Sequence, residues 1–489
     1  MPGSNDTTRR TWLLLFAVVL AGVCLAAGVC LAVGNRTGGI ESASAQTATR
    51  PNILFVMTDD MPKRLWSMPT LREQVAANGV RFTNAYLTQS LCCPSRATIL
   101  TGKYPHNHGI TGNSPPNGGE SVFRRSGQDR DTVATRLRSA GYRTALVGKY
   151  MNAYPTDGYR PPGWSYWYAK AGQSSDNKVN ENGTITSYTG SFPVAIADKA
   201  MRFLDRSTDQ ASDPPFMLFY WTSQPHLPSS VPSGYHTRFQ DATLPRPPSF
   251  NEADVSDKPA YIRNLPLLTR TQIDQLEADH KTQLRNMAHI DDTLARMLNL
   301  LRDRGKLSRT YVVFATDNGT HMGEHRYNMP RGSKSTPYEE AASTPLIIRG
   351  PGVQSGVVRD QLVANNDLAP TFARWGQTSA PAGFDGRSIT PLLSASPPST
   401  WRTALLNERH LLEPDDSPSP NYQAIFTAVG YRYVEYETDE RELYDLRTDP
   451  YELNSKRRAG NEELYDQLSA RLAQLRSCAG ATCRSAEGP

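Results

Sequence analysis

The side chains best suited to chemistry are acidic and amide groups that directly follow short apolar runs. Asp59 and Asp60 follow the run Ile-Leu-Phe-Val-Met, and Asp317 and Asn318 follow the run Tyr-Val-Val-Phe-Ala, in each case after one threonine. Such runs are typical of strands buried on both faces of a parallel sheet, whose carboxyl ends collect ligands at one edge. Three carboxylates and an amide oxygen at one edge would repel one another unless a cation lay among them. All-oxygen ligation favours Ca²⁺ or Mg²⁺ over zinc.

Two further strand ends extend this set. Lys149 follows the apolar run at 144–147, and His226 lies shortly after the run at 216–220. A single pair of adjacent polar residues does not by itself indicate a functional site, because adjacent aspartates such as Asp59 and Asp60 are also common in solvated turns and helix caps. The combination of several strand ends with the next motif favours a functional site.

That motif is the segment 91–103, which reads Leu-Cys-Cys-Pro-Ser-Arg-Ala-Thr-Ile-Leu-Thr-Gly-Lys. Pro94 and Ser95 suit a first helical turn, which puts Cys92 at a helix N-terminus. The helix dipole and free N–H groups stabilise anions there, and Arg96 adds a positive fork suited to an oxyanion. We therefore expect Cys92 to have a lowered pKa and to be able to act as a nucleophile. Plain burial or metal ligation is the alternative for two adjacent cysteines.

The elements that must position these residues alternate between strands and helices. Further apolar runs occur at 216–220 and 346–348, and helical spacing occurs at 132–140 and 271–304. This alternation predicts an α/β fold with a large, mostly parallel sheet covered by helices on both faces. The stretch 223–264 is rich in Pro, Ser and Asp and predicts a long surface excursion.

The pattern changes near residue 393. Residues 431–436 alternate between polar and apolar, residues 442–446 follow a polar turn, and 461–476 have helical spacing. This predicts a smaller C-terminal antiparallel-sheet domain capped by a helix. We expect three parts: an export signal or N-terminal anchor at 1–45, a catalytic domain at 46–395 and the smaller domain at 396–489.

Composition excludes several classes of protein. The chain has 489 residues, 38% hydrophobic and 21% charged, which excludes a disordered or collagen-like chain. The net charge of +5 comes without clustered Lys/Arg runs, which argues against nucleic-acid binding. An apolar run at 12–34 follows two arginines and precedes Ala-Ser-Ala at 43–45, which predicts export, with an uncleaved membrane anchor as the alternative. For an exported chain, Cys478 and Cys483 predict a small disulfide loop rather than a metal site, because no histidine or third cysteine is near them in sequence.

At this point a resemblance becomes specific. Cys-x-Pro-Ser-Arg followed by Leu-Thr-Gly-Lys resembles the signature of the formylglycine-dependent sulfatase family, of alkaline phosphatase-like fold, in which the first Cys is converted to formylglycine. The resemblance also covers 51–60, 317–319, Lys334 and 443–446, so it spans essentially the whole mature chain. Residues 92–108 with 148–150 are especially similar to N-acetylglucosamine-6-sulfatases and related glycosaminoglycan or aryl sulfatases.

The resemblance implies roles at matching positions. The implied ligands of a calcium ion, with magnesium as the alternative, are Asp59, Asp60, the modified Cys92, Asp317 and Asn318. The implied catalytic residues are Cys92, Arg96, Lys149, His226 and Lys334. One hydroxyl of the hydrated aldehyde would attack sulfur, helped by the ion and a carboxylate, and the other would later expel sulfate, a step that a thiol could not take. The two lysines would bind sulfate oxygens, Arg96 would hold the diol, and His226 would protonate the departing alcohol.

Some alternatives stay open. Many sulfatases carry Lys-x-His where this chain has Lys-Tyr-Met-Asn at 149–152, so His106, His108 and His321 are candidates for the second-step base. Aromatic residues between 159 and 168 could form a sugar-stacking platform or pack internally. The implied function is an exported sulfatase acting on a sulfated small molecule or glycan after a maturation enzyme has modified it. Its rivals are a phosphomonoester or phosphonate hydrolase of the same fold and a non-catalytic sulfated-glycan-binding protein.

Overall fold

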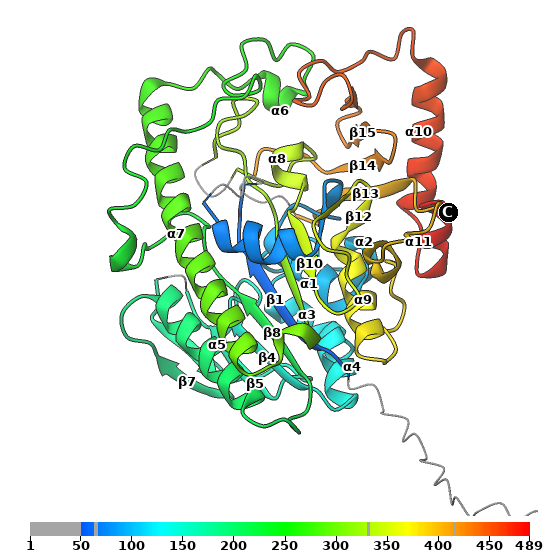
Figure 1. Ribbon diagram of the computed structural model, residues 1–489. Helices are drawn as coiled ribbons and strands as arrows, with labels where there is room; N and C mark the ends of the chain where they lie inside the picture. The colour runs from blue at the N-terminus through cyan, green and yellow to red at the C-terminus, as the bar shows by residue number, and fades with distance from the viewer. Residues whose placement is uncertain (1–49, 63–66, 174, 330–332, 414–416) are drawn as a thin grey trace, which may run out of the picture. The chain divides into compact units, whose positions relative to one another are not determined.

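A ten-stranded sheet carries the apolar runs of the sequence (Figure 1). The computed structural model describes residues 50–62, 67–173, 175–329, 333–413 and 417–489. In order across the sheet, the strands are β11 (Val357–Arg359), β2 (Val80–Phe82), β10 (Leu346–Arg349), β9 (Thr310–Thr316), β1 (Asn52–Thr58), β8 (Phe216–Trp221), β4 (Arg143–Gly148), β5 (Tyr166–Lys170), β6 (Lys178–Glu181) and β7 (Thr184–Ser187). The predicted strands therefore exist at the predicted places.

The central strands run parallel, as expected. β1 lies between β8 and β9, with Phe55 in register with Phe219 on one side and Val313 on the other. β4 joins β8 and β5 in the same direction. The expectation is wrong for β10, which pairs antiparallel with both β9 and β2. An apolar run indicates burial on both faces but carries no information about strand direction.

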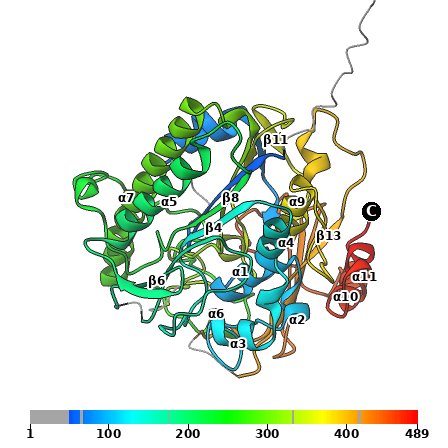
Figure 2. The ribbon, with the colours of Figure 1, turned by 90° about the horizontal axis from the view of Figure 1, so that it is seen from below.

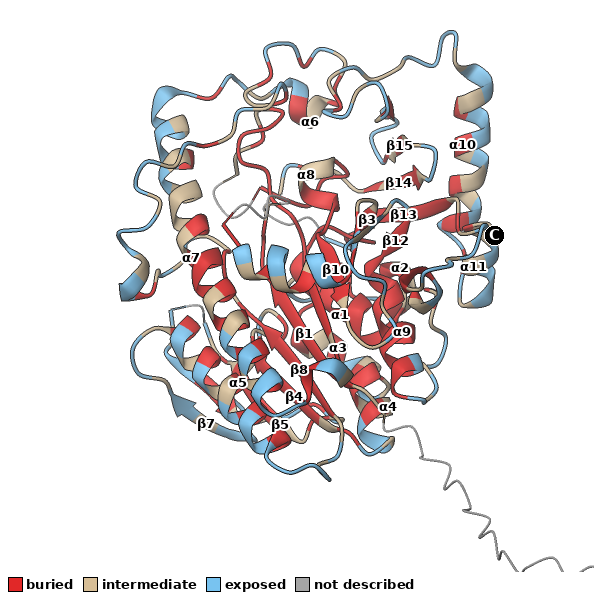
Figure 3. Cartoon of the chain, viewed as in Figure 1, coloured by how far each residue is buried: buried red, intermediate tan, exposed pale blue. Residues whose placement is uncertain are grey.

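Helices cover both faces of the sheet, and the alternation of side chains along β1 assigns each residue to one face. Phe55 belongs to the core formed with α1, α4 and α9, whereas Leu54 and Val56 belong to the core formed with α5 and α7. Seen from below, the two helix layers lie on opposite sides of the strands (Figure 2). The central strands β1 and β8 are buried along their length, whereas the edge strand β7 is largely exposed (Figure 3). These helices are α1 (Cys92–Thr101), α4 (Val133–Ser139), α5 (Phe192–Thr208), α7 (Arg270–Asp303) and α9 (Leu368–Trp375).

The longest helix follows its sequence pattern closely. α7 begins after Thr269, whose hydroxyl accepts a hydrogen bond from the Gln272 backbone N–H, while the Gln272 side chain accepts from the Thr269 N–H. This reciprocal cap satisfies donors that the first turn would otherwise leave free. The predicted apolar stripe, from Leu284 to Leu298, is buried against the sheet. The other face of this 34-residue helix is polar. Among the described residues, no helix has the length and apolar character needed to cross a membrane.

A second, antiparallel sheet forms the C-terminal region, as expected. Its strands, in order, are β13 (Ala404–Arg409), β14 (Tyr422–Thr427), β15 (Tyr431–Tyr436) and β16 (Arg441–Asp445). α10 (Glu462–Leu475) buries Leu468, Leu472 and Leu475 in a core shared with this sheet. The boundary near residue 395 between a catalytic and a smaller domain stays a prediction.

The remaining elements are short. They are β3 (Ala85–Tyr86), β12 (Val363–Ala364), α2 (Pro105–His108), α3 (Glu120–Arg125), α6 (Ala260–Arg263), α8 (Glu339–Ala342) and α11 (Ala481–Ala486). The stretch 223–264 holds only α6 and one 3₁₀ turn, in keeping with the predicted excursion. The export signal or anchor at 1–45, with Cys24 and Cys30, lies outside the described residues.

Candidate active site

The ends of β1 and β9 bring their polar residues into direct contact. The Asp60 backbone N–H donates to Asp317 Oδ1 at 3.2 Å, and Asn318 Nδ2 donates to Asp60 Oδ1 at 2.6 Å. Asp59, Asp317 and Asn318 are fully buried, and Asp60 nearly so. Parallel neighbours end at the same edge, so residues 257 or 258 positions apart in sequence become neighbours in space.

Cys92 is the first residue of α1 and lies against this carboxylate cluster. Its Sγ is 3.1 Å from Lys334 Nζ, 3.5 Å from Lys149 Nζ and 3.6 Å from Asp59 Oδ1. Cys93 has a different environment, because its Sγ accepts a hydrogen bond from the Asn152 backbone N–H at 3.0 Å. The geometry therefore distinguishes the two adjacent cysteines, and Cys92 is the one that contacts both lysines.

The expectation of a lowered pKa at Cys92 is wrong. Burial raises the pKa of the Cys92 thiol to about 12, although Lys149 and Lys334 oppose the shift. The cause is desolvation of the thiolate, with nearby Asp59 and Asp317 adding repulsion. A bare thiol at this position is protonated at neutral pH and is a poor nucleophile.

Arg96 lies one turn further along α1 and joins the two carboxylates. Its Nε donates to Asp317 Oδ2 at 2.9 Å, and its Nη2 lies 3.4 Å from Asp59 Oδ2. Burial by itself would raise the pKa of Asp59, but Lys149, His226, Arg96 and Lys334 together hold it well below its usual range. Burial and the neighbouring Asp59 charge raise the pKa of Asp317 instead. Two carboxylates that share one guanidinium thus differ in proton affinity.

The two lysines stay charged in this buried place. Burial alone would lower the pKa of both, but the adjacent carboxylates outweigh it and leave each pKa above its ordinary value. Lys149 pairs with Asp59, and Lys334 Nζ lies 2.5 Å and 2.7 Å from the two oxygens of Asp60. Gly148 allows the close approach that brings Lys149 here, because a Cβ at that position would lie 1.8 Å from the Trp221 carbonyl oxygen.

His226 lies at the more open side of the cluster. Its Nε2 is 3.4 Å from Asp60 Oδ2, and its side chain is 30% exposed, whereas that of Asp60 is 5% exposed. The histidine is therefore near the cluster and also reachable by a bound molecule. All residues predicted for the site from strand ends, the helix motif and the resemblance come together here.

The three histidines considered for the second step have different surroundings. His108 Nε2 shares a hydrogen bond with Thr98 Oγ1 at 3.0 Å, and its Nδ1 accepts from the Ile110 N–H, so both ring nitrogens are engaged. His106 contacts Glu408 and the Cys478 carbonyl near the C-terminal sheet. His321 lines a pocket beside Asp60 and so remains the candidate with access to the site.

The Cys478–Cys483 disulfide is present, as predicted. The premise of that prediction holds along the sequence but not in space, because a histidine lies near the pair in the fold. His106 Nε2 is 2.9 Å from the Cys478 carbonyl oxygen and its Nδ1 is 2.8 Å from Glu408 Oε1. The partner is 372 residues away in sequence, so spacing along the chain could not reveal it.

The donor set fits a hard divalent cation. Asn318 Nδ2 is used in hydrogen bonds to Asp60 and the Gly319 carbonyl, while Asn318 Oδ1 is buried without a hydrogen-bond partner among the described residues. A buried amide oxygen left unpaired costs free energy unless something binds it. Donor atoms of Asp59, Cys92 and Asp317 lie within 4.8 Å of one another, as do those of Asp59, Asp60 and His226. Carboxylate and amide oxygens are the ligands that Ca²⁺ and Mg²⁺ prefer.

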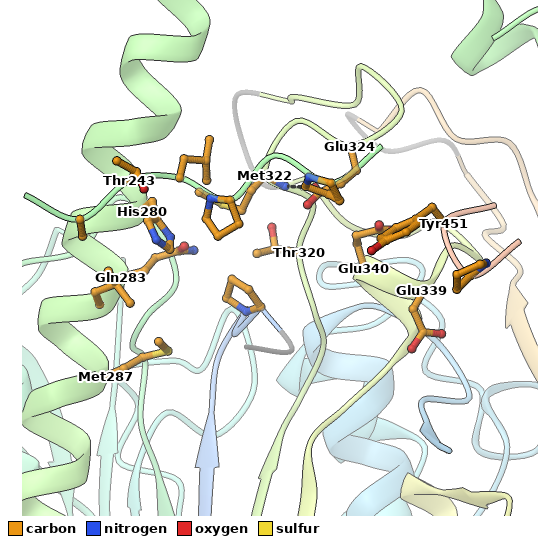
Figure 4. A pocket seen from close by; sticks show the side chains of 17 residues that line it. Thr243, His280, Gln283, Met287, Thr320, Met322, Glu324, Glu339, Glu340 and Tyr451 are labelled. Atoms are coloured by element: carbon orange, nitrogen blue, oxygen red, sulfur yellow. Dashed lines mark hydrogen bonds between the residues drawn. The ribbon is translucent and has the colours of Figure 1, made fainter. Parts of the chain in front are cut away.

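Two pockets adjoin the cluster. One has a volume of about 320 Å³ and is lined by Asp60, Leu227, His321 and Ser333, among others. The second, of about 430 Å³, shares Gln283, Thr320 and Met322 with the first. Figure 4 shows Thr320 between the α7 side chains of the second pocket and a group of glutamates on its other side. The excursion at 223–264 contributes residues 242–245 and 247 to this pocket.

The aromatic residues at 159–168 do not form an open platform. Trp164, Trp167 and Tyr168 are buried in the cores, and Tyr166 stacks on Phe203. These four side chains therefore pack internally and do not form a sugar-stacking platform. Tyr159 is half-buried beneath Arg124, whose guanidinium lies 3.5 Å from its ring centre.

Residues that position the cysteine pair escaped the sequence analysis. Asn113 Oδ1 accepts a hydrogen bond from the Cys93 backbone N–H at 2.9 Å, and Asn152 contacts the Cys93 thiol. Trp221 lies under Arg96, with 5.3 Å between guanidinium and ring centre. Asn113 has no motif around it, whereas Trp221 ends a predicted strand and could have been selected by the strand-end rule.

Comparisons with known proteins agree with this fold. The family model described as Sulfatase matches residues 51–378, and one described as N-sulphoglucosamine sulphohydrolase, C-terminal, matches residues 323–478. The chain is 30% identical to the N-acetylglucosamine-6-sulfatase of Capra hircus over 91% of this chain and 86% of that protein. The chain therefore belongs to the sulfatase family, and it is a sulfuric ester hydrolase.

Solved structures add to this. A protein in complex with its substrate D-glucosamine-2-N,6-O-disulfate is similar with a TM-score of 0.76 and 25% identity, covering 90% of this chain and 100% of that chain. A phosphonate monoester hydrolase of Agrobacterium radiobacter has a TM-score of 0.66 at 20% identity, covering 88% of this chain and 96% of the other. The second likeness concerns the fold alone.

Proposed function

We propose that this enzyme hydrolyses the sulfate ester of an amino sugar, using Cys92 converted to formylglycine and a hard divalent cation. The observation that carries the proposal is the placement of two ammonium groups on one buried atom. Lys334 Nζ and Lys149 Nζ lie 3.1 Å and 3.5 Å from Cys92 Sγ, at the first residue of a helix. Cations that converge on a nucleophile stabilise the negative charge of an anionic ester while the nucleophile attacks it.

The charge count of the cluster supports an anionic substrate. Three carboxylates, those of Asp59, Asp60 and Asp317, face three fixed cations, Arg96, Lys149 and Lys334. The protein charges cancel, so a bound divalent ion leaves the site with a charge of about +2. A sulfate ester anion entering this buried site gains from that excess, because charges interact strongly where water is excluded.

The chain's own residues then have distinct tasks. Lys149 and Lys334 bind the sulfate oxygens and stabilise charge that develops on them. Arg96 holds the position of residue 92 relative to Asp317, since it contacts that carboxylate from one turn along the same helix. His226, at the exposed side, gives a proton to the departing sugar hydroxyl.

The cation and the modification supply what this cluster lacks. Asp59, Asp60, Asp317 and Asn318 would hold the ion, which acts as a Lewis acid on the ester. Formylglycine supplies a hydrated aldehyde, whose hydroxyl is a nucleophile on a carbon that can release sulfate again. The raised pKa of the Cys92 thiol, about 12, is a physical reason to replace it.

The names of the relatives support the proposed substrate class. The Capra hircus protein is named an N-acetylglucosamine-6-sulfatase, and the similar solved structure holds a 6-O-sulfated glucosamine. We infer that the sulfate group enters beside Cys92 and that the sugar extends into the 320 Å³ pocket lined by Asp60 and His321. The excursion at 223–264 then contributes to specificity through the adjoining pocket.

We also propose that the protein is exported and meets a formylglycine-generating enzyme. The Cys478–Cys483 disulfide supports export, since disulfides persist in oxidising compartments. The N-terminal segment acts as a cleaved signal or as a membrane anchor. Fractionation of expressing cells, with the protein recovered in the medium or in the membrane pellet, distinguishes these from retention in the cytosol.

Peptide mass spectrometry tests the modification. In protein made together with a maturation enzyme, the peptide containing residue 92 should weigh roughly 18 Da less than its thiol form. The neighbouring Cys93 in the same peptide is an internal control and should alkylate normally. An unmodified Cys92 in active protein would contradict the proposal.

Activity measurements test the substrate. Glucosamine 6-sulfate should be hydrolysed faster than a simple aryl sulfate, and a phosphate or phosphonate monoester more slowly than either. Cys92→Ala should lose sulfate release while keeping its circular dichroism spectrum. Faster phosphonate hydrolysis would favour the rival hydrolase, and tight glycan binding without turnover by modified protein would favour a binding protein.

A further inference from the structure

A second buried cluster of ionisable groups lies outside the residues assigned to the active site. His325 comes from the loop after β9, Glu340 from α8, Glu452 from the segment after β16, and Glu252 from the excursion at 223–264. His325 and Glu452 are fully buried, and Glu252 nearly so. Four segments distant in sequence thus bring one imidazole and several carboxylates together.

Two polar atoms in this cluster point at each other without making a hydrogen bond. His325 Nε2 and Glu340 Oε2 are buried, have no hydrogen-bond partner among the described residues, and lie 3.8 Å apart. That distance is too long for a hydrogen bond, which needs about 2.7–3.2 Å. Two ligands of one zinc ion, each about 2.0–2.2 Å from it, can lie up to about 4 Å apart. The gap suits an ion between the two atoms.

The other ring nitrogen of His325 is already fixed. His325 Nδ1 lies 2.7 Å from Glu252 Oε2, with which it shares a hydrogen bond. A carboxylate that accepts from one imidazole nitrogen sets the tautomer and leaves the other nitrogen free to bind a metal, an arrangement common around metal-binding histidines. Glu452 completes the set, since donor atoms of His325, Glu340 and Glu452 all lie within 4.8 Å of one another.

The charges of the cluster do not cancel. Its directly paired charged residues are Glu252, Asp257, Glu339, Glu340, Glu452, Lys258 and Arg432. Five carboxylates against two cations leave three negative charges, which must be neutralised by protons or by a cation.

We propose that His325, Glu340 and Glu452 bind a divalent transition-metal ion, of which Zn²⁺ is the representative. The imidazole ligand favours zinc over the hard ions that suit the all-oxygen cluster at Asp317 and Asn318. Glu340 also lines the 430 Å³ pocket, where Figure 4 shows it near Glu339 and Tyr451, so the site has a path of entry. The ion would fasten together the four segments that surround this side of the pocket. This proposal does not depend on the proposed function.

Metal binding to the full mature chain tests the proposal. The protein is stripped with EDTA, saturated with Ca²⁺ to occupy the all-oxygen cluster, and titrated with ZnCl₂ in a calorimeter. We expect one zinc ion per chain and a higher melting temperature with zinc than without it. Co²⁺ in place of zinc should give a visible absorption spectrum of a nitrogen-ligated ion. Wild-type protein that takes up no zinc under calcium saturation would overturn the proposal.

Three variants locate the ion. His325→Gln should abolish zinc uptake, and Glu340→Gln, which changes a single unpaired oxygen, should weaken it at least tenfold. His106→Gln is the matched control, because His106 also pairs with a glutamate but has both nitrogens engaged, and it should bind zinc like wild type. If His325→Gln fails to fold, Glu340→Gln decides. Unchanged zinc affinity in Glu340→Gln, or equal loss in His106→Gln, would contradict the assignment.

Discussion

Two buried arginines of this molecule each join two carboxylates, yet the two clusters differ in what they leave available. Arg96 contacts Asp59 and Asp317 at the end of the central sheet. Arg402 contacts Asp367 at 2.5 Å and Glu487 at 3.3 Å, where the C-terminal residues meet the segment before β13. All six side chains are essentially inaccessible to solvent.

The difference lies in the neighbours. Around Arg96, two lysines converge on Cys92. Around Arg402, Glu487 accepts a hydrogen bond from the Tyr104 hydroxyl at 2.7 Å, and Tyr104 packs in the C-terminal core. Burial and an arginine–carboxylate pair are therefore common to a reactive site and to a structural junction. Two lysines that converge on a nucleophile, together with an open side, distinguish the reactive site.

The largest expected difference between the two clusters concerns His226, the proposed proton donor at the open side of the Arg96 cluster. His226→Gln should lower kcat/KM for a sugar sulfate by about 10²–10⁴, because general acid catalysis contributes that much when the leaving group is a poor one. Hydrolysis of 4-nitrophenyl sulfate should fall far less, since that leaving group departs without a proton. His236→Gln, an exposed histidine in the same excursion, is the control. Equal losses on both substrates would rule out the acid role of His226.

Lys149 tests whether the lysines beside Cys92 act on the substrate. Lys149→Met should lower kcat/KM by about 10²–10³, the usual loss for one preorganised donor to a developing charge. Lys199→Met removes a half-exposed lysine that pairs with Glu181, and it should leave kcat/KM unchanged. Steady-state kinetics on both variants decides the matter. Wild-type kinetics in Lys149→Met would show that Lys149 has a structural role only.

For Arg402 we expect the opposite result, a loss of stability without a loss of activity. Arg402→Met leaves Asp367 and Glu487 buried without the arginine that joins them, which costs about 3–5 kcal/mol of unfolding free energy. Urea denaturation measures the loss, and kcat at low temperature should stay at the wild-type value while the chain is folded. A folded variant that has lost its activity would show that this junction is coupled to catalysis.

The smallest effect concerns the His106–Glu408 pair beside the disulfide. Burial by itself would lower the pKa of His106, but the hydrogen bond and charge of Glu408 raise the pKa to about 9. Since the folded pKa exceeds the ordinary value of 6.5, the pair stabilises fully below about pH 6.5 and its contribution is lost as pH rises through about 9. The melting temperature of wild type should exceed that of His106→Gln most at about pH 6. A gap that widens toward pH 10 would contradict the assigned charge state.

Local patterns predicted much of the fold. The strand runs, the helical spacing of α7 and the placement of Cys92 at a helix start depend on neighbours within a few residues, and all are confirmed. The direction of β10 was not predictable in this way, because either direction buries the same Leu346 and Ile348 side chains. Lys334 came into the candidate site through the family resemblance alone, since its own segment has no strand end or helix motif.

The sequence was sufficient to name the fold class and to bring Asp59, Asp317 and Cys92 together, because parallel strands end at one edge and a motif marks the helix start. The protonation of Cys92, the partners of His106 and the facing atoms of His325 and Glu340 required the tertiary structure. Each depends on desolvation and on charges contributed by segments far apart in the chain, and both act through space rather than along the sequence.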